Sequence, residues 1–98
     1  MRPKGVKVGW FAYPIEYRAE IKEGDQEYYG RQFEKDRILV STKFGEAIER
    51  ESLLHELIHA ISADRGLGLK ESQVLNMANG LFDSLANKPA ADWIFRGK

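Results

Sequence analysis

The sequence predicts a single α+β domain spanning residues 1–98, in which a small, mostly antiparallel sheet packs against two helices that form an αα-hairpin. Three observations predict this architecture. Residues 1–42 are rich in β-forming side chains and are interrupted by turn residues, whereas residues 46–64 contain neither proline nor glycine. Further along the chain, residues 69–87 carry apolar side chains at helical spacing.

The first forty residues predict strands that are separated by turns. Residues 6–13 alternate as a strand does, and the run 15–21 stays extended after Pro14, so that one long strand or two abutting strands fit. The remaining strands are predicted over residues 26–33 and 37–41, with turns at Gly24–Asp25 and Lys35–Asp36.

The first helix is predicted over residues 44–65. From Phe44 onward the hydrophobic period is that of a helix, the first turn is acidic, and Gly66 after its end suits a left-handed cap. The apolar side chains of this helix spread over a wide arc, which predicts burial on most of its sides.

The second helix is predicted over residues 69–87, with Pro89 ending it. The short link Gly66–Leu67–Gly68 makes the two helices an αα-hairpin. Residues 88–98 are expected to form a tail that packs its aromatic side chains back on the body. The aromatic residues expected to serve in the core or in an interface are Trp10, Phe11, Trp93 and Phe95.

Composition excludes several classes of function. Fifteen basic and fifteen acidic side chains give a formal net charge of zero, so neither nucleic acid nor a membrane surface is an expected partner. The absence of cysteine excludes disulfides, thiolate zinc sites and a cysteine nucleophile, and it is compatible with the cytoplasm. The apolar run 8–13 is short, aromatic and followed by Pro14, so we expect a strand there and no export signal.

The only two histidines, His55 and His59, lie four residues apart in the predicted first helix, and Glu56 directly follows the first. On a helix this spacing points both imidazoles in the same direction, as two ligands for zinc. Random placement would produce the pattern in roughly 2 of 1000 such sequences. The alternative, a pair of partly buried polar residues at the edge of the core, is the weaker interpretation.

Glu56 occupies the position of a general base. Its side chain leaves the helix about 100° from that of His55, which directs its carboxylate toward a zinc-bound water more easily than toward the metal. Zinc lowers the pKa of such a water to about 7, so Glu56 could take its proton during attack on a carbonyl and pass it to the leaving amine. The alternative is an ordinary solvent-facing glutamate.

The third ligand must be a carboxylate, an amide or a second molecule, because no other histidine or cysteine is present. Glu71 is the first candidate, since it falls in the apolar stripe of the second helix, where a bare charge is costly to bury. The short link places Glu71 near the end of the first helix, however, whereas His55 lies more than two helical turns before that end. The loop would therefore have to run back along the first helix for Glu71 to reach His55. Asp64 is the competing candidate; it could instead orient a histidine or face solvent.

The sequence does not identify the group that would stabilise a developing oxyanion. Tyr28, Tyr29 and Arg31 carry suitable donors. Tyrosines in a sheet more commonly pack across strands, which is the preferred interpretation here.

The HExxH string and the second helix together resemble the gluzincin arrangement of short HExxH proteins. The similarity is to the ImmA/IrrE-like metallopeptidases and to the compact zinc metallopeptidases of tailed phages, and it is densest over residues 38–89. In that family a glutamate of the second helix, followed by small and apolar residues at the same offsets, is the third zinc ligand. The residues that carry the resemblance include His55, Glu56, His59, Glu71, Val74, Met77 and Ala78.

The resemblance implies a zinc metallopeptidase on a minimal zincin-like domain in a bacterial or phage-infected cell, with His55, His59 and Glu71 as ligands and Glu56 as general base. It further implies that the strand 37–41 receives a peptide or protein substrate as an added strand. Two other functions stay open. One is a non-catalytic module in which zinc holds the two helices together, and the other is a protein that binds a partner through its sheet edge.

Overall fold

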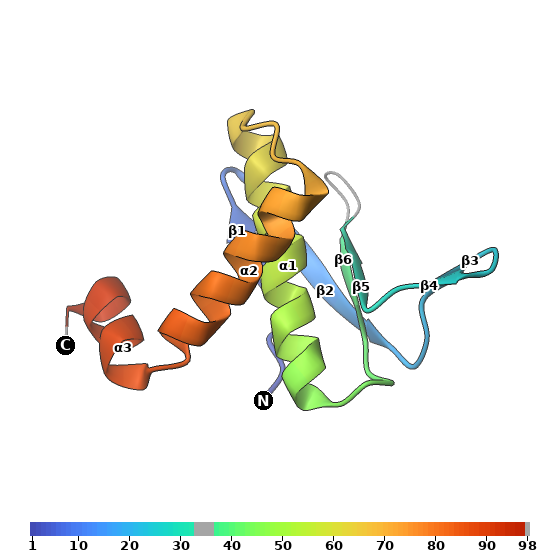
Figure 1. Ribbon diagram of the computed structural model, residues 1–98, viewed down its shortest axis with the longest axis horizontal. Coiled ribbons are helices and arrows are strands. Elements are labelled where there is room, and N and C mark those ends of the chain that lie inside the picture. Colours follow the sequence, from blue (N-terminus) through green and yellow to red (C-terminus); the bar gives the residue numbers. More distant parts are fainter. Residues whose placement is uncertain (33–36, 98) are drawn as a thin grey trace.

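The computed structural model describes residues 1–32 and 37–97 and confirms the α+β class (Figure 1). Four strands form one mixed sheet in the order β1-β2-β6-β5, and two short strands form a separate hairpin. The predicted turn at Lys35–Asp36 and the predicted strand end at Phe33 lie outside the described residues, as does Lys98. The elements are β1 (Gly5–Val8), β2 (Phe11–Arg18), β3 (Lys22–Glu23), β4 (Gln26–Glu27), β5 (Gly30–Gln32), β6 (Ile38–Ser41), α1 (Glu46–Arg65), α2 (Glu71–Leu85) and α3 (Lys88–Arg96).

β1 and β2 form an antiparallel hairpin where the sequence predicted a continuous extended run. Val8 pairs with Phe11, which leaves Gly9 and Trp10 as the turn. Gly9 has a φ of 60°, a left-handed conformation that glycine adopts without a steric penalty from a Cβ atom. The alternation of residues 6–13 therefore belongs to two paired strands, and Trp10 is fully exposed between them.

β6 lies inside the sheet, which corrects the prediction that residues 37–41 form an edge able to receive a substrate. It pairs in parallel with Ile15–Arg18 of β2 on one side and antiparallel with β5 on the other. All four of its residues are buried, as expected for a strand whose apolar run is covered on both faces. Because both of its edges are already hydrogen-bonded, β6 cannot accept another strand. The edge of the sheet beside it is β5.

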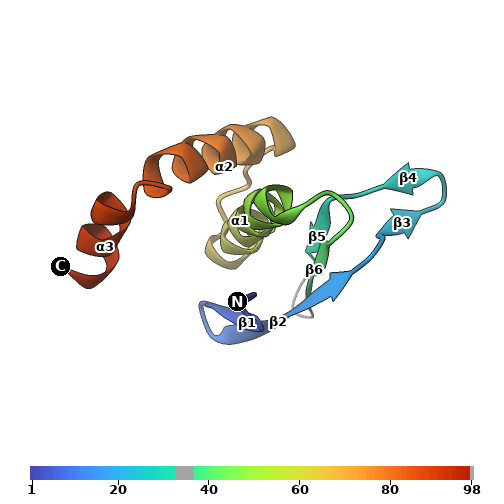
Figure 2. The ribbon, with the colours of Figure 1, turned by 90° about the horizontal axis from the view of Figure 1, so that it is seen from below.

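β3 and β4 project beyond the four-stranded sheet as a two-stranded arm (Figure 2). Lys22 pairs with Glu27, and the turn lies at Gly24–Asp25, as the sequence predicted. The predicted strand over residues 26–33 is divided, because residues 28 and 29 leave the ladder between β4 and β5. The arm therefore leads directly into the edge strand β5.

α1 lies between the sheet and α2, as its wide apolar arc predicted (Figure 2). Leu57 and Ile61 pack against the buried cluster of the sheet. Ile58 faces the other way and packs against Val74 and Ala78 of α2. Ile58 and Val74 are buried, and full burial of an aliphatic side chain of this size contributes about 1.5–3 kcal/mol, so these contacts help to hold α1 between the sheet and α2.

α2 buries its predicted apolar stripe only in part. Val74 and Ala78 are buried and Phe82 is half-buried, whereas Leu75, on the same predicted stripe, is 46% exposed. The helix ends at Leu85, earlier than predicted, and its second half leads away from α1 (Figure 1).

α3 replaces the predicted tail. Asn87 caps this helix by accepting a hydrogen bond from the backbone N–H of Ala90 at 3.4 Å, and Pro89 lies in the first turn, where proline is tolerated. None of its residues is buried, and Trp93 is 70% exposed, so the expected packing on the body does not occur. No helix within residues 1–32 and 37–97 combines the length and the apolar character required to cross a membrane.

Candidate metal centre

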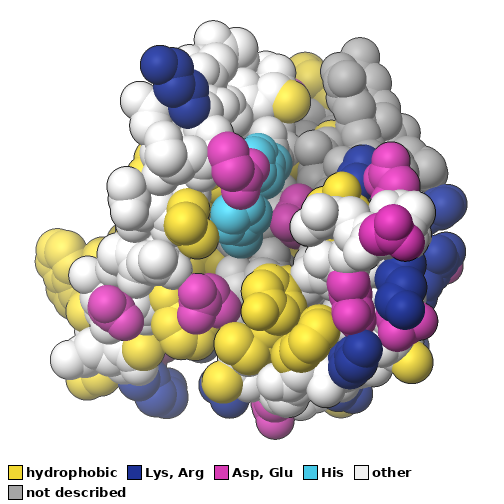
Figure 3. All heavy atoms as spheres, turned by 45° about the vertical axis from the view of Figure 1, so that its right-hand side comes forward, with side chains coloured by type: hydrophobic (Ala, Val, Ile, Leu, Met, Phe, Trp, Pro, Cys, Tyr) yellow, Lys and Arg dark blue, Asp and Glu magenta, His cyan; other side chains and the backbone are white. Residues whose placement is uncertain are grey.

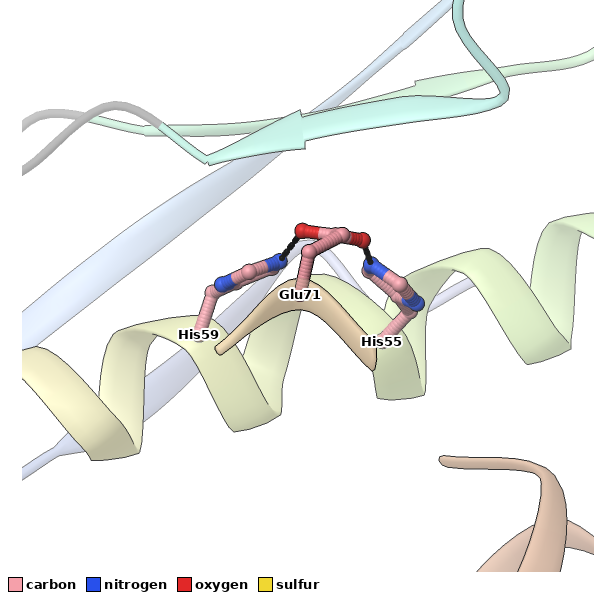
Figure 4. Close-up of side chains that lie close together, drawn as sticks. All are labelled: His55, His59 and Glu71. Atoms are coloured by element: carbon pink, nitrogen blue, oxygen red, sulfur yellow. Dashed lines mark ion pairs between the residues drawn. The ribbon is translucent and has the colours of Figure 1, made fainter. Parts of the chain in front are cut away.

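Two imidazoles and one carboxylate meet between α1 and α2. His55 and His59 lie on the same face of α1, with ring centroids 4.9 Å apart. Glu71, the first residue of α2, reaches both of them: its Oε1 lies 2.7 Å from His55 Nε2, and its Oε2 lies 2.8 Å from His59 Nε2 (Figure 4). The structure thus brings together the three side chains that the sequence indicated as metal ligands.

The link between α1 and α2 turns back along α1, which explains how Glu71 reaches the histidines. Gly66 closes α1 in a left-handed conformation, and the N–H of Leu67 donates to Ser62 O at 2.9 Å. The hydroxyl oxygen of Ser62 then accepts a hydrogen bond from the N–H of Leu69 at 3.0 Å. α2 therefore begins beside α1 and not below its end. Glu71 can thus reach His55 and His59 although the link between the two helices is short.

Glu71 is not buried in an apolar stripe as the sequence predicted. Its side chain is 68% exposed, whereas the imidazoles of His55 and His59 are largely covered. A carboxylate at the first position of a helix is favoured by the N-terminal dipole, so this placement carries little desolvation cost. The contact with both imidazoles, and not the burial of a charge, is what makes Glu71 a ligand candidate.

Asp64, the competing candidate, lies apart from this group. Its carboxylate approaches the β1–β2 turn, where a Cβ atom built on Gly9 would come within 2.4 Å of Asp64 Oδ1. In the described part of the chain, the group of His, Asp and Glu side chains close enough together to hold a metal ion is His55, His59 and Glu71. The structure therefore favours a role for Asp64 beside the turn over a role as ligand.

The donor set of this group fits zinc. One ligand atom from each of the three side chains can be chosen so that all lie within 4.8 Å of one another. Two imidazole nitrogens and one carboxylate oxygen form a common protein donor set for zinc, which leaves a fourth position for water. Because the ligands come from α1 and α2, a metal held here would also join the two helices.

Glu56 lies against the edge strand β5, in contact with a glycine to which the sequence had suggested no role. Gly30 is buried, and a Cβ atom built on it would lie 3.2 Å from Glu56 Cγ and 3.5 Å from Glu56 Oε2. The same Cβ atom would lie 3.0 Å from the backbone oxygen of Leu39 in β6. Gly30 therefore leaves room for the Glu56 side chain to pass close to β5. A glycine inside a strand pattern commonly marks such a close approach, and this signal could have pointed to Gly30.

These side chains line one open groove that follows α1 (Figure 3). The groove encloses about 640 Å³. α1 forms its floor, residues 26–31 form the sheet wall, and Glu71 and Leu75 of α2 form the helix wall. Figure 3 shows hydrophobic side chains gathered next to the two histidines. The candidate metal centre is thus open to solvent along a groove, and the edge strand β5 lies beside this groove.

The three residues considered as oxyanion donors all belong to the sheet wall. The guanidinium of Arg31 lies 4.7 Å from the centroid of the Tyr28 ring and forms an ion pair with Glu23 of the arm. Tyr29 packs edge-on against Phe44, with ring centroids 4.6 Å apart. Both tyrosines make ring contacts, but residues 28 and 29 lie outside the strands, so these contacts are not the cross-strand packing that the sequence predicted. The charge of Arg31 already has a partner.

Comparison with known proteins finds no relative of this chain. No protein-family model, no curated protein and no solved structure matches the chain. The resemblance to the gluzincins stays a prediction.

Proposed function

We propose that this chain is a zinc-dependent hydrolase of peptide bonds, in which His55, His59 and Glu71 hold the metal and Glu56 is the general base. The observation that carries the proposal is the convergence of three potential ligand atoms within 4.8 Å of one another in an open groove. Glu56, buried and next in sequence to His55, lines the same groove.

Zinc held by these residues would lower the pKa of a coordinated water and polarise the carbonyl group of the substrate. Glu56 accepts a proton from the attacking water while the oxygen of that water bonds to the carbonyl carbon. The same carboxylate then donates that proton to the amide nitrogen as the C–N bond breaks. One water is consumed, and the products are a carboxylic acid and an amine.

The substrate is proposed to lie along β5. β5 is the edge strand of the four-stranded sheet and forms part of the groove wall next to Glu56. An extended peptide can add to such an edge through backbone hydrogen bonds, which would hold its carbonyl groups over the floor of α1. This replaces the role that the sequence assigned to residues 37–41.

A second candidate is a non-catalytic module in which zinc fastens α2 to α1. The observation that favours it is that the ligands come from both helices, while α2 buries few of its own side chains. In such a module the metal would contribute to folding, and Glu56 would have no chemical role.

Substitution of Glu56 by Gln separates the two candidates. In a hydrolase, Glu56→Gln should bind zinc and melt as the wild type does, and it should lose at least about 100-fold in peptide hydrolysis. Glu46→Gln is the matched control, because it makes the same change on α1 outside the groove. The measurements are zinc content after purification without chelators, thermal melting, and cleavage of unfolded protein substrates. A wild type that binds zinc but cleaves nothing, or a Glu56→Gln variant that loses stability, would favour the structural module.

A further inference from the structure

The groove continues beyond the candidate metal centre toward the beginning of α1. Its floor includes Ile48, Glu51 and Ser52 in addition to the histidines. Ile48 precedes His55 by seven residues, which is two helical turns or about 10 Å along the axis. A peptide whose scissile bond lies at the metal would therefore place its neighbouring residues over this part of the floor.

Glu51 is the acidic group of this extension. It lies four residues before His55, so the two side chains share one face of α1, and both line the groove. Its side chain is partly buried. Within residues 1–32 and 37–97, Glu51 forms no ion pair, whereas its neighbour Arg50 is paired with Glu46.

The other charged groups of the groove already have partners or roles. Glu27 accepts hydrogen bonds from Lys43 Nζ at 3.1 Å, and these raise the pKa of the Lys43 ammonium. Arg31 is paired with Glu23. Since Glu56 and Glu71 serve as base and ligand in the proposed function, Glu51 is the negative charge that the groove offers to a substrate.

The surroundings of Glu51 suit a long side chain with an apolar stem. Ile48 lies one turn before it on the floor, and Leu75 and Tyr29 stand on the two walls, both with exposed apolar surface. Lys and Arg side chains bury their methylene groups against such surfaces while their charged ends reach a carboxylate. An acidic side chain at the same place would meet Glu51 and be repelled.

We propose that the groove selects peptides with a Lys or Arg side chain within about two residues of the scissile bond, and that Glu51 is the specificity-determining residue. The spacing follows from the geometry, because His55 and Glu51 are about 6 Å apart along the helix and an extended peptide advances about 3.3 Å per residue. This inference rests on the proposed peptidase function.

The test uses pools of fluorogenic peptides in which one position at a time is fixed as Lys, Arg, Gln, Leu or Glu. The wild type should cleave pools with Lys or Arg at one position about tenfold faster than the Gln pool, and Glu51→Gln should bring that ratio close to one. Glu46→Gln, with the same loss of charge elsewhere on α1, should keep the preference. Cleavage without a basic preference, or equal behaviour of the two variants, overturns the inference and leaves the proposed function standing.

A binding measurement decides the same point without turnover. Labelled peptides of the Lys and Gln pools are titrated into the Glu56→Gln protein and into Glu51→Gln/Glu56→Gln, and fluorescence anisotropy is followed at low and high salt. The Glu56→Gln protein, which retains Glu51, should bind the Lys pool about tenfold more tightly than the Gln pool at low salt, and this preference should weaken as salt screens the charge. The double variant should bind the two pools equally. If the wild type cleaves no pool, the proposed function fails; equal binding of the Lys and Gln pools overturns the role of Glu51.

Discussion

The two walls of the groove fix the positions of Glu56 and Glu71 by different means. On the sheet wall, Gly30 is buried in a hydrogen-bonded strand, and its missing side chain sets the space that Glu56 occupies. On the helix wall, Glu71 is mostly exposed and is held by its contacts with the two imidazoles. Packing against β5 therefore positions Glu56, whereas contacts with the two imidazoles position Glu71. Changes on the helix wall should therefore affect metal binding, and changes on the sheet wall should affect turnover.

The largest expected effect is the loss of zinc affinity in Glu71→Ala. Loss of a group that merely orients a zinc ligand typically costs about 10- to 100-fold in affinity, so removal of a ligand should cost roughly 100-fold or more. Asp64→Ala is the matched control, since Asp64 lies beside Gly9 and outside the ligand group. Competition with a chromogenic chelator measures both affinities. Equal losses in the two variants would mean that the third ligand has been misassigned.

A smaller effect, confined to turnover, is expected for Gly30→Ala. The added methyl group would press on Glu56 and on the backbone oxygen of Leu39, and of these two Glu56 is the one that can move. A displacement of up to about 1 Å at a reacting group can cost as much as 100-fold, so we expect hydrolysis to fall by about tenfold or more while zinc affinity changes little. Peptide hydrolysis and chelator competition on the same samples provide the two readouts.

Gly80→Ala is the control for that substitution. Gly80 lies in α2, and a Cβ atom built there meets nothing within 4 Å. Alanine in a helix interior is favoured over glycine by about 1 kcal/mol, so this variant should melt slightly higher and keep full activity. A Gly30→Ala protein that loses zinc in parallel with activity would show that the sheet wall also supports the ligands.

The parts of this site that the sequence predicted are those governed by local geometry. His55, Glu56 and His59 lie on one helix, where spacing alone determines direction. Glu71 was chosen because a buried charge seemed to need a partner, yet its side chain is exposed and reaches the histidines because Ser62 holds the link beside α1. The sequence thus predicted that Glu71 lies near the histidines, but for a reason that the structure does not support.

The parts that the sequence missed depend on contacts between distant segments. The place of β6 inside the sheet comes from its parallel pairing with β2, and no local pattern encodes which strands become neighbours. The role of Gly30 arises only when β5 lies against α1. The hairpin at Gly9 was hidden because alternation continues through a two-residue turn, so that both strands together resemble one.

The smallest expected effect lies away from both walls, where the N-terminus is tied to α1. Arg2 Nε donates to Glu49 Oε1 at 2.6 Å and Arg2 Nη2 to Oε2 at 3.1 Å, and the Glu49 side chain is only 6% exposed. The hydrogen bonds from Arg2 lower the pKa of the Glu49 carboxyl. Since the folded pKa lies below the unfolded one of about 4.3, the stabilisation is complete above that pH and is lost as the pH falls through the folded pKa.

Arg2→Gln should therefore lower the melting temperature slightly at pH 7, and its difference from the wild type should shrink as the pH drops below about 4. Arg50→Gln is the matched control: its pair with Glu46 spans 3.8 Å between two exposed side chains, and such pairs contribute little. Melting curves between pH 3 and 7 measure both variants, and zinc affinity and hydrolysis are followed at pH 7. Because Arg2 and Glu49 line a separate hollow, both activities should stay at wild-type levels. A loss of either would show that the two walls depend on the N-terminal tether as well as on Gly30 and Glu71.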